Sequence, residues 1–95
     1  MIAISVRKDG IEIHGHAGYA ETGKDIVCAG VTALTQTLIR SMQGLTRDKV
    51  EYEVSPGRAD IQYGDLSEEG KLLVDFFFLG ICAVERDFPG YVKII

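Results

Sequence analysis

Apolar and polar residues alternate in four short stretches of the chain, at positions 2–6, 11–14, 50–54 and 59–63. A period of two is typical of a β-strand with one buried face. Asp9-Gly10 and Pro56-Gly57 separate these stretches in pairs and predict two hairpin turns. A fifth strand is expected at 91–95.

Two longer segments have the period of a helix instead. Apolar residues recur every three or four positions from Val27 to Leu45, behind Asp25 as a good N-cap. The second helix is expected to begin behind the N-cap Ser67 and to stop before Pro89. The order β-β-α-β-β-α-β predicts an α+β sandwich in which two helices pack on one mixed sheet.

The second helix carries more apolar surface than one face can hold. The stripe expected to face the core is Leu73, Phe76, Phe77, Gly80, Ala83 and Val84. Val74, Phe78 and Ile81 then point elsewhere, either onto more of the sheet or a loop, or onto a partner. Large exposed apolar patches are unusual on monomers, so we expect a homodimer.

Length and charge narrow the class of protein. A chain of 95 residues predicts a single domain, 1–95, and a net charge of −4 without a basic stripe argues against binding to a nucleic-acid backbone. No apolar run is long enough for a membrane span, and the first residues lack a signal-peptide pattern. We therefore expect a cytoplasmic protein in which Cys28 and Cys82 are free thiols.

Candidate chemistry is concentrated between residues 14 and 32. An N-cap at Asp25 would place Cys28 in the first helical turn, where free N–H groups and the helix dipole favour a thiolate. His14 and His16 lie upstream, and imidazolium is the usual partner of an activated sulfur. N–H groups at the helix start, including that of Cys28, could also stabilise an oxyanion.

Simpler explanations exist for each of these residues. Cys28 could be a buried core residue, and Asp25 could act as a cap alone, its charge opposing a thiolate. Glu21 and Lys24 are more often solvated loop charges. A zinc site is a further alternative, although its four candidate ligands match no compact spacing. Those ligands would be His14, His16, Cys28 and Cys82.

The run from 15 to 30 resembles the signature of the ribosomal-processing cysteine protease family. It reads Gly-His-Ala at 15–17 and Glu-x-Gly-x-Asp-Ile-Val-Cys-Ala-Gly at 21–30. The resemblance implies a catalytic dyad of His16 and Cys28, with Asp25 supporting the cysteine or orienting the histidine. Thr32 stands where the family pattern often has serine, and His14 lies outside the signature.

The same resemblance implies a specific activity. The protein would be a cysteine endopeptidase of ribosome biogenesis that removes a short N-terminal extension from a large-subunit ribosomal protein, cutting after an aromatic pair. It would form a homodimer and use no metal or other cofactor. The loop expected to order around substrate consists of Ala17, Gly18, Tyr19, Ala20, Glu21, Thr22, Gly23 and Lys24.

The residues alone leave two other classes of function open. One is a non-catalytic, ribosome-associated module that binds peptides in the same groove. The other is a redox-sensing protein that uses Cys28 and Cys82 as a thiol pair, although the position of Cys82 in an apolar helix favours a core role.

Overall fold

The computed structural model describes all 95 residues. Its elements follow the predicted order and type. They are β1 (Ile2–Arg7), β2 (Gly10–His14), α1 (Ile26–Leu45), β3 (Val50–Ser55), β4 (Arg58–Tyr63), α2 (Glu68–Asp87) and β5 (Val92–Ile94). Asp25 and Ser67 are the N-caps of the two helices, and α2 ends before Pro89, as expected.

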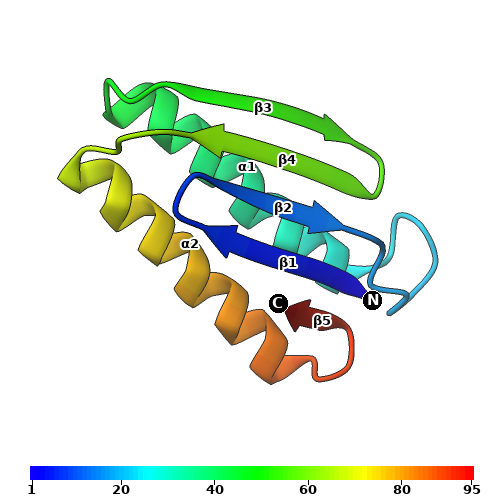
Figure 1. Ribbon diagram of the computed structural model, residues 1–95. Helices are drawn as coiled ribbons and strands as arrows, with labels where there is room; N and C mark the ends of the chain where they lie inside the picture. Colours follow the sequence, from blue (N-terminus) through cyan, green and yellow to red (C-terminus); the bar gives the residue numbers. More distant parts are fainter.

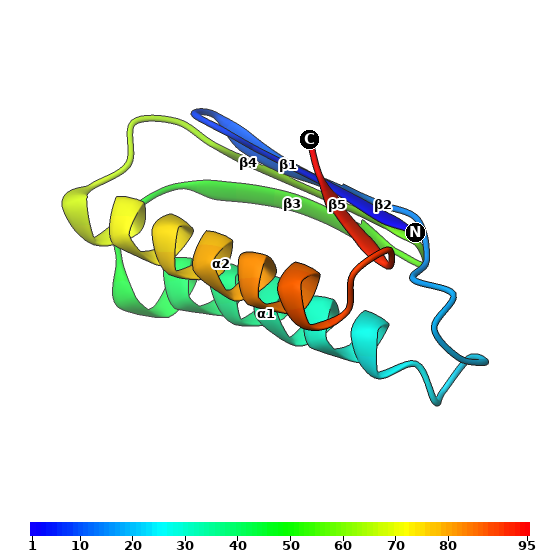
Figure 2. The same ribbon diagram turned by 90° about the horizontal axis from the view of Figure 1, so that it is seen from below.

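All five strands form one sheet in the order β3-β4-β2-β1-β5. Neighbouring strands are antiparallel except β1 and β5, which are parallel, so the sheet is mixed. Both helices lie side by side on one face of this sheet (Figures 1 and 2). The predicted two-layer α+β sandwich is therefore confirmed. Neither helix is long and apolar enough to cross a membrane.

The two hairpins use their glycines differently. Gly57 has φ 74°, which fits the third position of a type II turn behind Pro56. The first turn is formed by Lys8 and Asp9, so the expectation of an Asp9-Gly10 turn was wrong by one residue. Gly10 instead begins β2, where a Cβ would lie 2.6 Å from the carbonyl oxygen of Ile61. Close approach of β4 requires glycine there.

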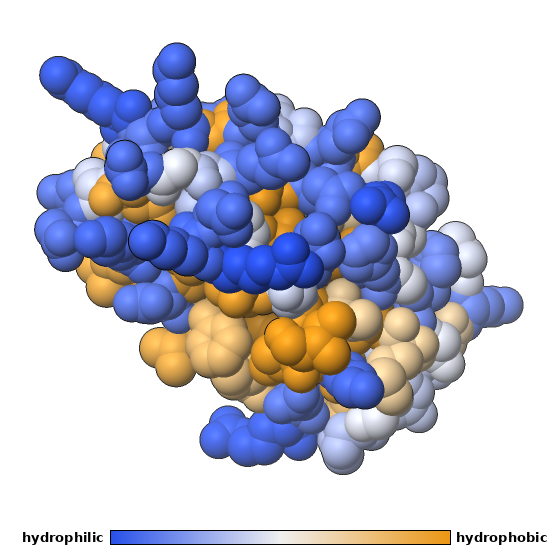
Figure 3. Space-filling model, viewed as in Figure 1, coloured by the Kyte–Doolittle hydropathy of each residue, from blue (hydrophilic) through white to orange (hydrophobic).

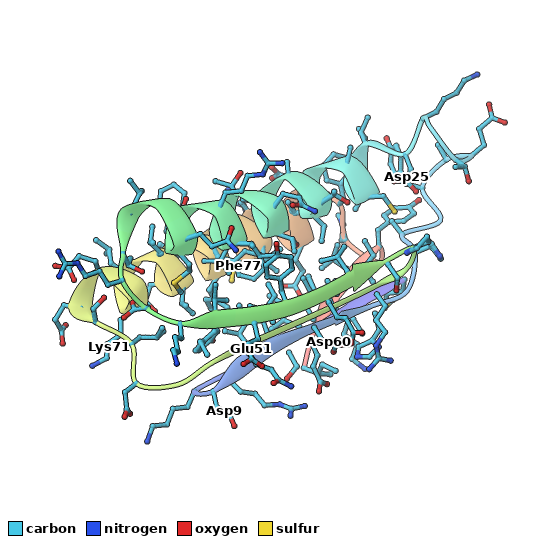
Figure 4. All side chains as sticks on the ribbon, turned by 90° about the horizontal axis from the view of Figure 1, so that it is seen from above. Asp9, Asp25, Glu51, Asp60, Lys71 and Phe77 are labelled. Atoms are coloured by element: carbon cyan, nitrogen blue, oxygen red, sulfur yellow. The ribbon has the colours of Figure 1, made fainter.

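The core lies between the sheet and the helices. Phe77 of α2 points into this layer, whereas Glu51 and Asp60 lie on the sheet (Figure 4). The buried apolar side chains of the strands are Ile2, Ile4, Ile11, Ile13, Ala59, Ile61, Tyr63 and Val92. Those of the helices are Val27, Val31, Leu38, Ile39, Met42, Phe77 and Ile81. Alternation along the strands thus predicted the inner face of the sheet correctly.

The buried face of α2 differs from the predicted one. Ile81 is completely buried, although it was expected to point away from the core, and Val74 also packs against the core. Phe76 is 68% exposed and Ala83 is exposed, although both were expected inside. Between residues 72 and 84 the only charged residue of α2 is Asp75, so the period cannot choose between adjacent apolar stripes, and tertiary packing decides.

Replacing Ile81 by Ala tests this assignment. Because Ile81 is completely buried, the cavity should lower the free energy of unfolding by about 2–5 kcal/mol. Leu45→Ala is the control, since Leu45 is 73% exposed and its loss should change stability by less than about 0.5 kcal/mol. Urea unfolding followed by circular dichroism measures both, and equal small effects would contradict the assignment.

Candidate active site

The start of α1 is fixed by the carboxylate of Asp25. Its Oδ1 accepts hydrogen bonds from the N–H groups of Val27 and Cys28, both at 3.0 Å. These are two of the N–H groups that a helix leaves without an intrahelical partner. The cap sets the beginning of the helix at Ile26 and places Cys28 in its first turn, as the sequence predicted.

The second carboxylate oxygen of Asp25 holds the preceding loop. Oδ2 accepts from the N–H of Tyr19 at 3.0 Å and from that of Ala20 at 3.4 Å. The hydrogen bond from Cys28 N–H lowers the pKa of Asp25 below its ordinary value, and partial burial opposes this. The N–H groups of Ala20, Tyr19 and Val27 lower the pKa further. The carboxylate is thus the charged link between loop and helix (Figure 4).

The Cys28 sulfur lies half-buried beneath the first residue of that loop. The N–H of Ala17 donates to Sγ over 3.3 Å, and Ala17 itself is buried. One backbone donor of the loop therefore points directly at the candidate nucleophile. Sequence reasoning did not find this contact, since nothing in the pattern marks Ala17 as a donor to a residue eleven positions away.

His16 is held against the β3–β4 turn. A Cβ at position 57 would lie 2.6 Å from His16 Nε2, so glycine leaves the space that the imidazole ring fills. Backbone bonds fix the same segment: Gly15 N–H donates to Gly57 O at 2.8 Å, and the Met1 amino group donates to His16 O at 2.7 Å. The ring is consequently presented at one end of the sheet, in an exposed position.

Both members of the candidate dyad line one pocket of about 150 Å³. Thr32 and Gln36 of α1 line it from the helix side, and Val54 and Ser55 of β3 line it from the edge of the sheet. The structure therefore brings His16 and Cys28 to a common space that remains open to a ligand.

The other histidine and cysteine lie elsewhere. His14 is on the opposite face of the sheet, where its Nε2 is 3.7 Å from Glu12 and its Nδ1 is 3.5 Å from Arg58. Cys82 lies half-buried on α2 and does not line the pocket of Cys28. The four residues considered for zinc are thus not brought together, and no three His, Cys, Asp or Glu side chains cluster as a metal site requires.

The loop from Ala17 to Lys24 has its own anchor. The Tyr19 ring makes edge-to-face contacts with Phe88 and Tyr91, with centroids 5.4 and 5.1 Å apart. Such aromatic pairs each contribute about 0.5–1.5 kcal/mol beyond the area that they bury. Glu21 and Lys24 form an exposed ion pair at 2.9 Å, as expected of solvated loop charges. Tyr19 therefore ties the loop to the segment after α2.

One expectation about the oxyanion site was wrong. The N–H of Cys28 was a candidate donor, but it is bonded to Asp25 Oδ1. The N–H of Val27 is bonded to the same oxygen. A side-chain cap satisfies the donors that a reacting carbonyl would need, so these two N–H groups of the helix start are not free.

A cysteine at a helix N-terminus that shares a pocket with a histidine is the arrangement used by thiol proteases. Fold and site together place the protein among the cysteine-dependent hydrolases. The chain belongs to the cysteine protease Prp family, whose model matches residues 1–93.

Several relatives cover nearly the whole chain. The ribosomal processing cysteine protease Prp of Staphylococcus aureus is 25% identical over 100 residues, which cover 98% of this chain and 94% of that protein. The protein of the same name from Bacillus subtilis is 23% identical over 90 residues, covering 87% of this chain and 80% of that protein.

Solved structures share the fold. The S. aureus protease with a covalently linked product peptide superposes with a TM-score of 0.88 at 23% identity, covering 98% of this chain and 94% of that chain. SMU.848 from Streptococcus mutans superposes with a TM-score of 0.78 at 30% identity, covering 99% of this chain and 91% of that chain.

Asp25→Asn should separate the two tasks of this carboxylate. Asparagine caps helices about as well as aspartate, because its carbonyl oxygen accepts the same bonds. Its amide NH₂ is a donor, however, and cannot accept from Tyr19 and Ala20. We expect faster hydrogen exchange at the amides of residues 19 and 20, with little change at 27 and 28, measured by NMR. Equal acceleration at both pairs would show that the cap and the loop contact are not separable.

Proposed function

We propose that this protein is a cysteine endopeptidase that removes a short N-terminal extension from a protein of the large ribosomal subunit. In this proposal Cys28 is the nucleophile and His16 is the general base. The observation that carries it is the shared pocket of His16 and Cys28, in a chain that matches the protease family from residue 1 to 93. The relatives from S. aureus and B. subtilis are ribosomal processing cysteine proteases, which supports a ribosomal substrate for this protein.

The proposed reaction begins when His16 takes the proton of the Cys28 thiol. The thiolate attacks the scissile carbonyl and forms a tetrahedral oxyanion. His16 then gives its proton to the leaving amine, and water, activated by the same imidazole, hydrolyses the resulting thioester. The reaction needs no metal or cofactor, because the side chains themselves supply nucleophile and base.

The donor nearest to the reacting sulfur is the N–H of Ala17, 3.3 Å from Sγ. In the proposed mechanism this N–H stabilises negative charge on the sulfur before attack and is the first candidate for the oxyanion afterwards. Asp25 takes no part in proton transfer. It supports the site, because its two oxygens hold Cys28 and the loop in register.

Cleavage of a peptide that spans the extension tests the proposal. Cys28→Ala should abolish cleavage, and His16→Ala should lower kcat/KM by about 10²–10⁴-fold, the usual contribution of a general base. His14→Ala is the matched control and should retain activity, because His14 lies on the outer face of the sheet. Product masses identify the cut. Undiminished cleavage by Cys28→Ala would refute the proposal.

The proposal includes a homodimer formed through α2. Leu72, Phe76 and Leu79 follow one another at helical spacing on one side of α2, and each is 68% exposed. Figure 3 shows apolar residues gathered beside the hydrophilic band that covers the strands. Monomeric proteins rarely expose such a stripe, and a two-fold axis would bury it against its copy.

Phe76→Glu should convert this dimer to a monomer. A carboxylate at the centre of an apolar two-fold interface would be buried opposite its own copy, at high cost in desolvation and repulsion. Multi-angle light scattering over a range of protein concentrations measures the mass. Leu45→Glu is the control, since Leu45 is similarly exposed at the end of α1. A wild-type protein that stays monomeric at all concentrations would contradict the dimer.

We also propose that the protein acts in the cytoplasm, where ribosomal proteins are made and thiols stay reduced. The net charge of −4 suits a basic ribosomal substrate. Fractionation of cells followed by immunodetection would test the location.

A further inference from the structure

Strand β3 ends the sheet without a neighbour on its outer side (Figures 1 and 4). Its six residues pair with β4 in unbroken register, and the strand contains no proline and no bulge. The opposite edge is β5, which is only three residues long. Proteins usually protect long edge strands by bulges, prolines or covering segments, because open edges recruit further strands. β3 lacks these three kinds of protection, and its charged side chains, Glu51 and Glu53, lie on the outer face of the sheet.

The register shows which backbone groups face the open edge. Pro56 and Gly57 form a two-residue turn, so the flanking pair Ser55 and Arg58 is hydrogen-bonded. Hydrogen-bonded and non-hydrogen-bonded pairs alternate along antiparallel strands. The N–H and C=O groups of residues 54, 52 and 50 therefore point away from β4, into the space where another strand would pair.

The side chains of Tyr52 and Val54 form an exposed apolar surface beside this edge. Tyr52 and Val54 are paired with Ile61 and Ala59, so they belong to the face of the sheet that carries the helices. Their partners on β4 are buried, yet Tyr52 is 50% exposed and Val54 is 46% exposed. Val50 still packs against the core, but α1 covers the inner face of β3 only in part and leaves Tyr52 and Val54 accessible.

This open edge runs into the candidate active site. Val54 and Ser55 line the pocket that also contains Cys28 and His16. On the other side of the pocket, Thr32 lies one helical turn after Cys28. A peptide whose scissile carbonyl lies at Cys28 would therefore lie beside the open edge of β3. At every second residue this edge has a backbone N–H and C=O without a partner.

We propose that the substrate peptide binds in extended form along the open edge of β3, as a sixth strand of the sheet. This inference rests on the proposed protease function. Backbone hydrogen bonds to residues 54 and 52 would hold the peptide in register with Cys28, and alternate side chains would contact Val54 and Tyr52. The substrate class is thus an extended segment with apolar residues at every second position next to the scissile bond.

A scan of N-methylated substrate peptides tests the inference. One backbone N–H at a time is replaced by N–CH₃, except at the two residues of the scissile bond. A strand that pairs with β3 presents every second N–H to it, so kcat/KM should fall about tenfold at alternate positions and little between them. If the positions sensitive to methylation lie on the N-terminal side of the scissile bond, the peptide pairs with β3 in parallel orientation. If they lie on the C-terminal side, the pairing is antiparallel.

Variants of Val54 supply a second measurement. Val54→Pro removes the N–H that faces the open edge but leaves the pairing with β4, because edge strands tolerate proline on their solvent side. We expect KM to rise at least fivefold in Val54→Pro. Val54→Ala keeps the N–H and loses only the side chain, so its KM should rise less. Circular dichroism and thermal unfolding show whether each variant is folded.

The outcomes separate this inference from the proposed function. If the unmodified peptide is cut and methylation has no alternating effect, the protease function stands and strand addition is refuted. If the unmodified peptide is not cut, the proposed function itself fails. If Val54→Pro instead changes the molecular mass while methylation shows no alternation, the open edge of β3 pairs with a second copy and not with substrate.

Discussion

The candidate site depends on one carboxylate. Asp25 Oδ1 accepts the N–H groups of Val27 and Cys28, while Oδ2 accepts those of Tyr19 and Ala20. A neutral N-cap such as serine has a single side-chain oxygen. It could cap the start of the helix, but it could not hold the loop at the same time. The charge strengthens all four bonds, because hydrogen bonds to an ionised acceptor are stronger than neutral ones. Cys28 and the loop above it are therefore positioned by the same group.

Three segments from different parts of the chain meet at this end of the sheet. The segment after β2 brings His16 and Ala17, the start of α1 brings Cys28, and the β3–β4 turn brings Gly57 against the imidazole ring. The turn requires a positive φ and the ring requires the absence of a Cβ, so position 57 is constrained twice. The rigid sheet thus sets the position of the base, and the helix sets that of the nucleophile.

Local chemistry made the elements and the position of Cys28 in the first turn of α1 predictable from the sequence, whereas the choice of His16 as its partner came from the resemblance of residues 15–30 to the protease family. Alternation, capping residues and Pro56-Gly57 each act within a few residues, and all were read correctly. The errors arose where distant segments decide. Ile81 and Phe76 lie on neighbouring stripes of an apolar helix, and only packing on the sheet and α1 selects between them. The Asp9-Gly10 pattern predicted a turn at Gly10, whereas this glycine lies in β2 and permits the close approach of β4. The contacts of Tyr19 with Phe88 and Tyr91 join segments about seventy residues apart, and no local pattern records them.

The cap also changes how an oxyanion can be stabilised at this site. A helix N-terminus is usually credited with supplying free donors, but here Asp25 has already engaged the N–H groups of residues 27 and 28. The donor that points at the sulfur belongs to Ala17, which lies in the loop. Because Asp25 holds that loop through Tyr19 and Ala20, the order of the loop and the supply of the donor are coupled. In the proposed mechanism, a loop released from Asp25 would leave Cys28 on its helix but would remove the donor beside it.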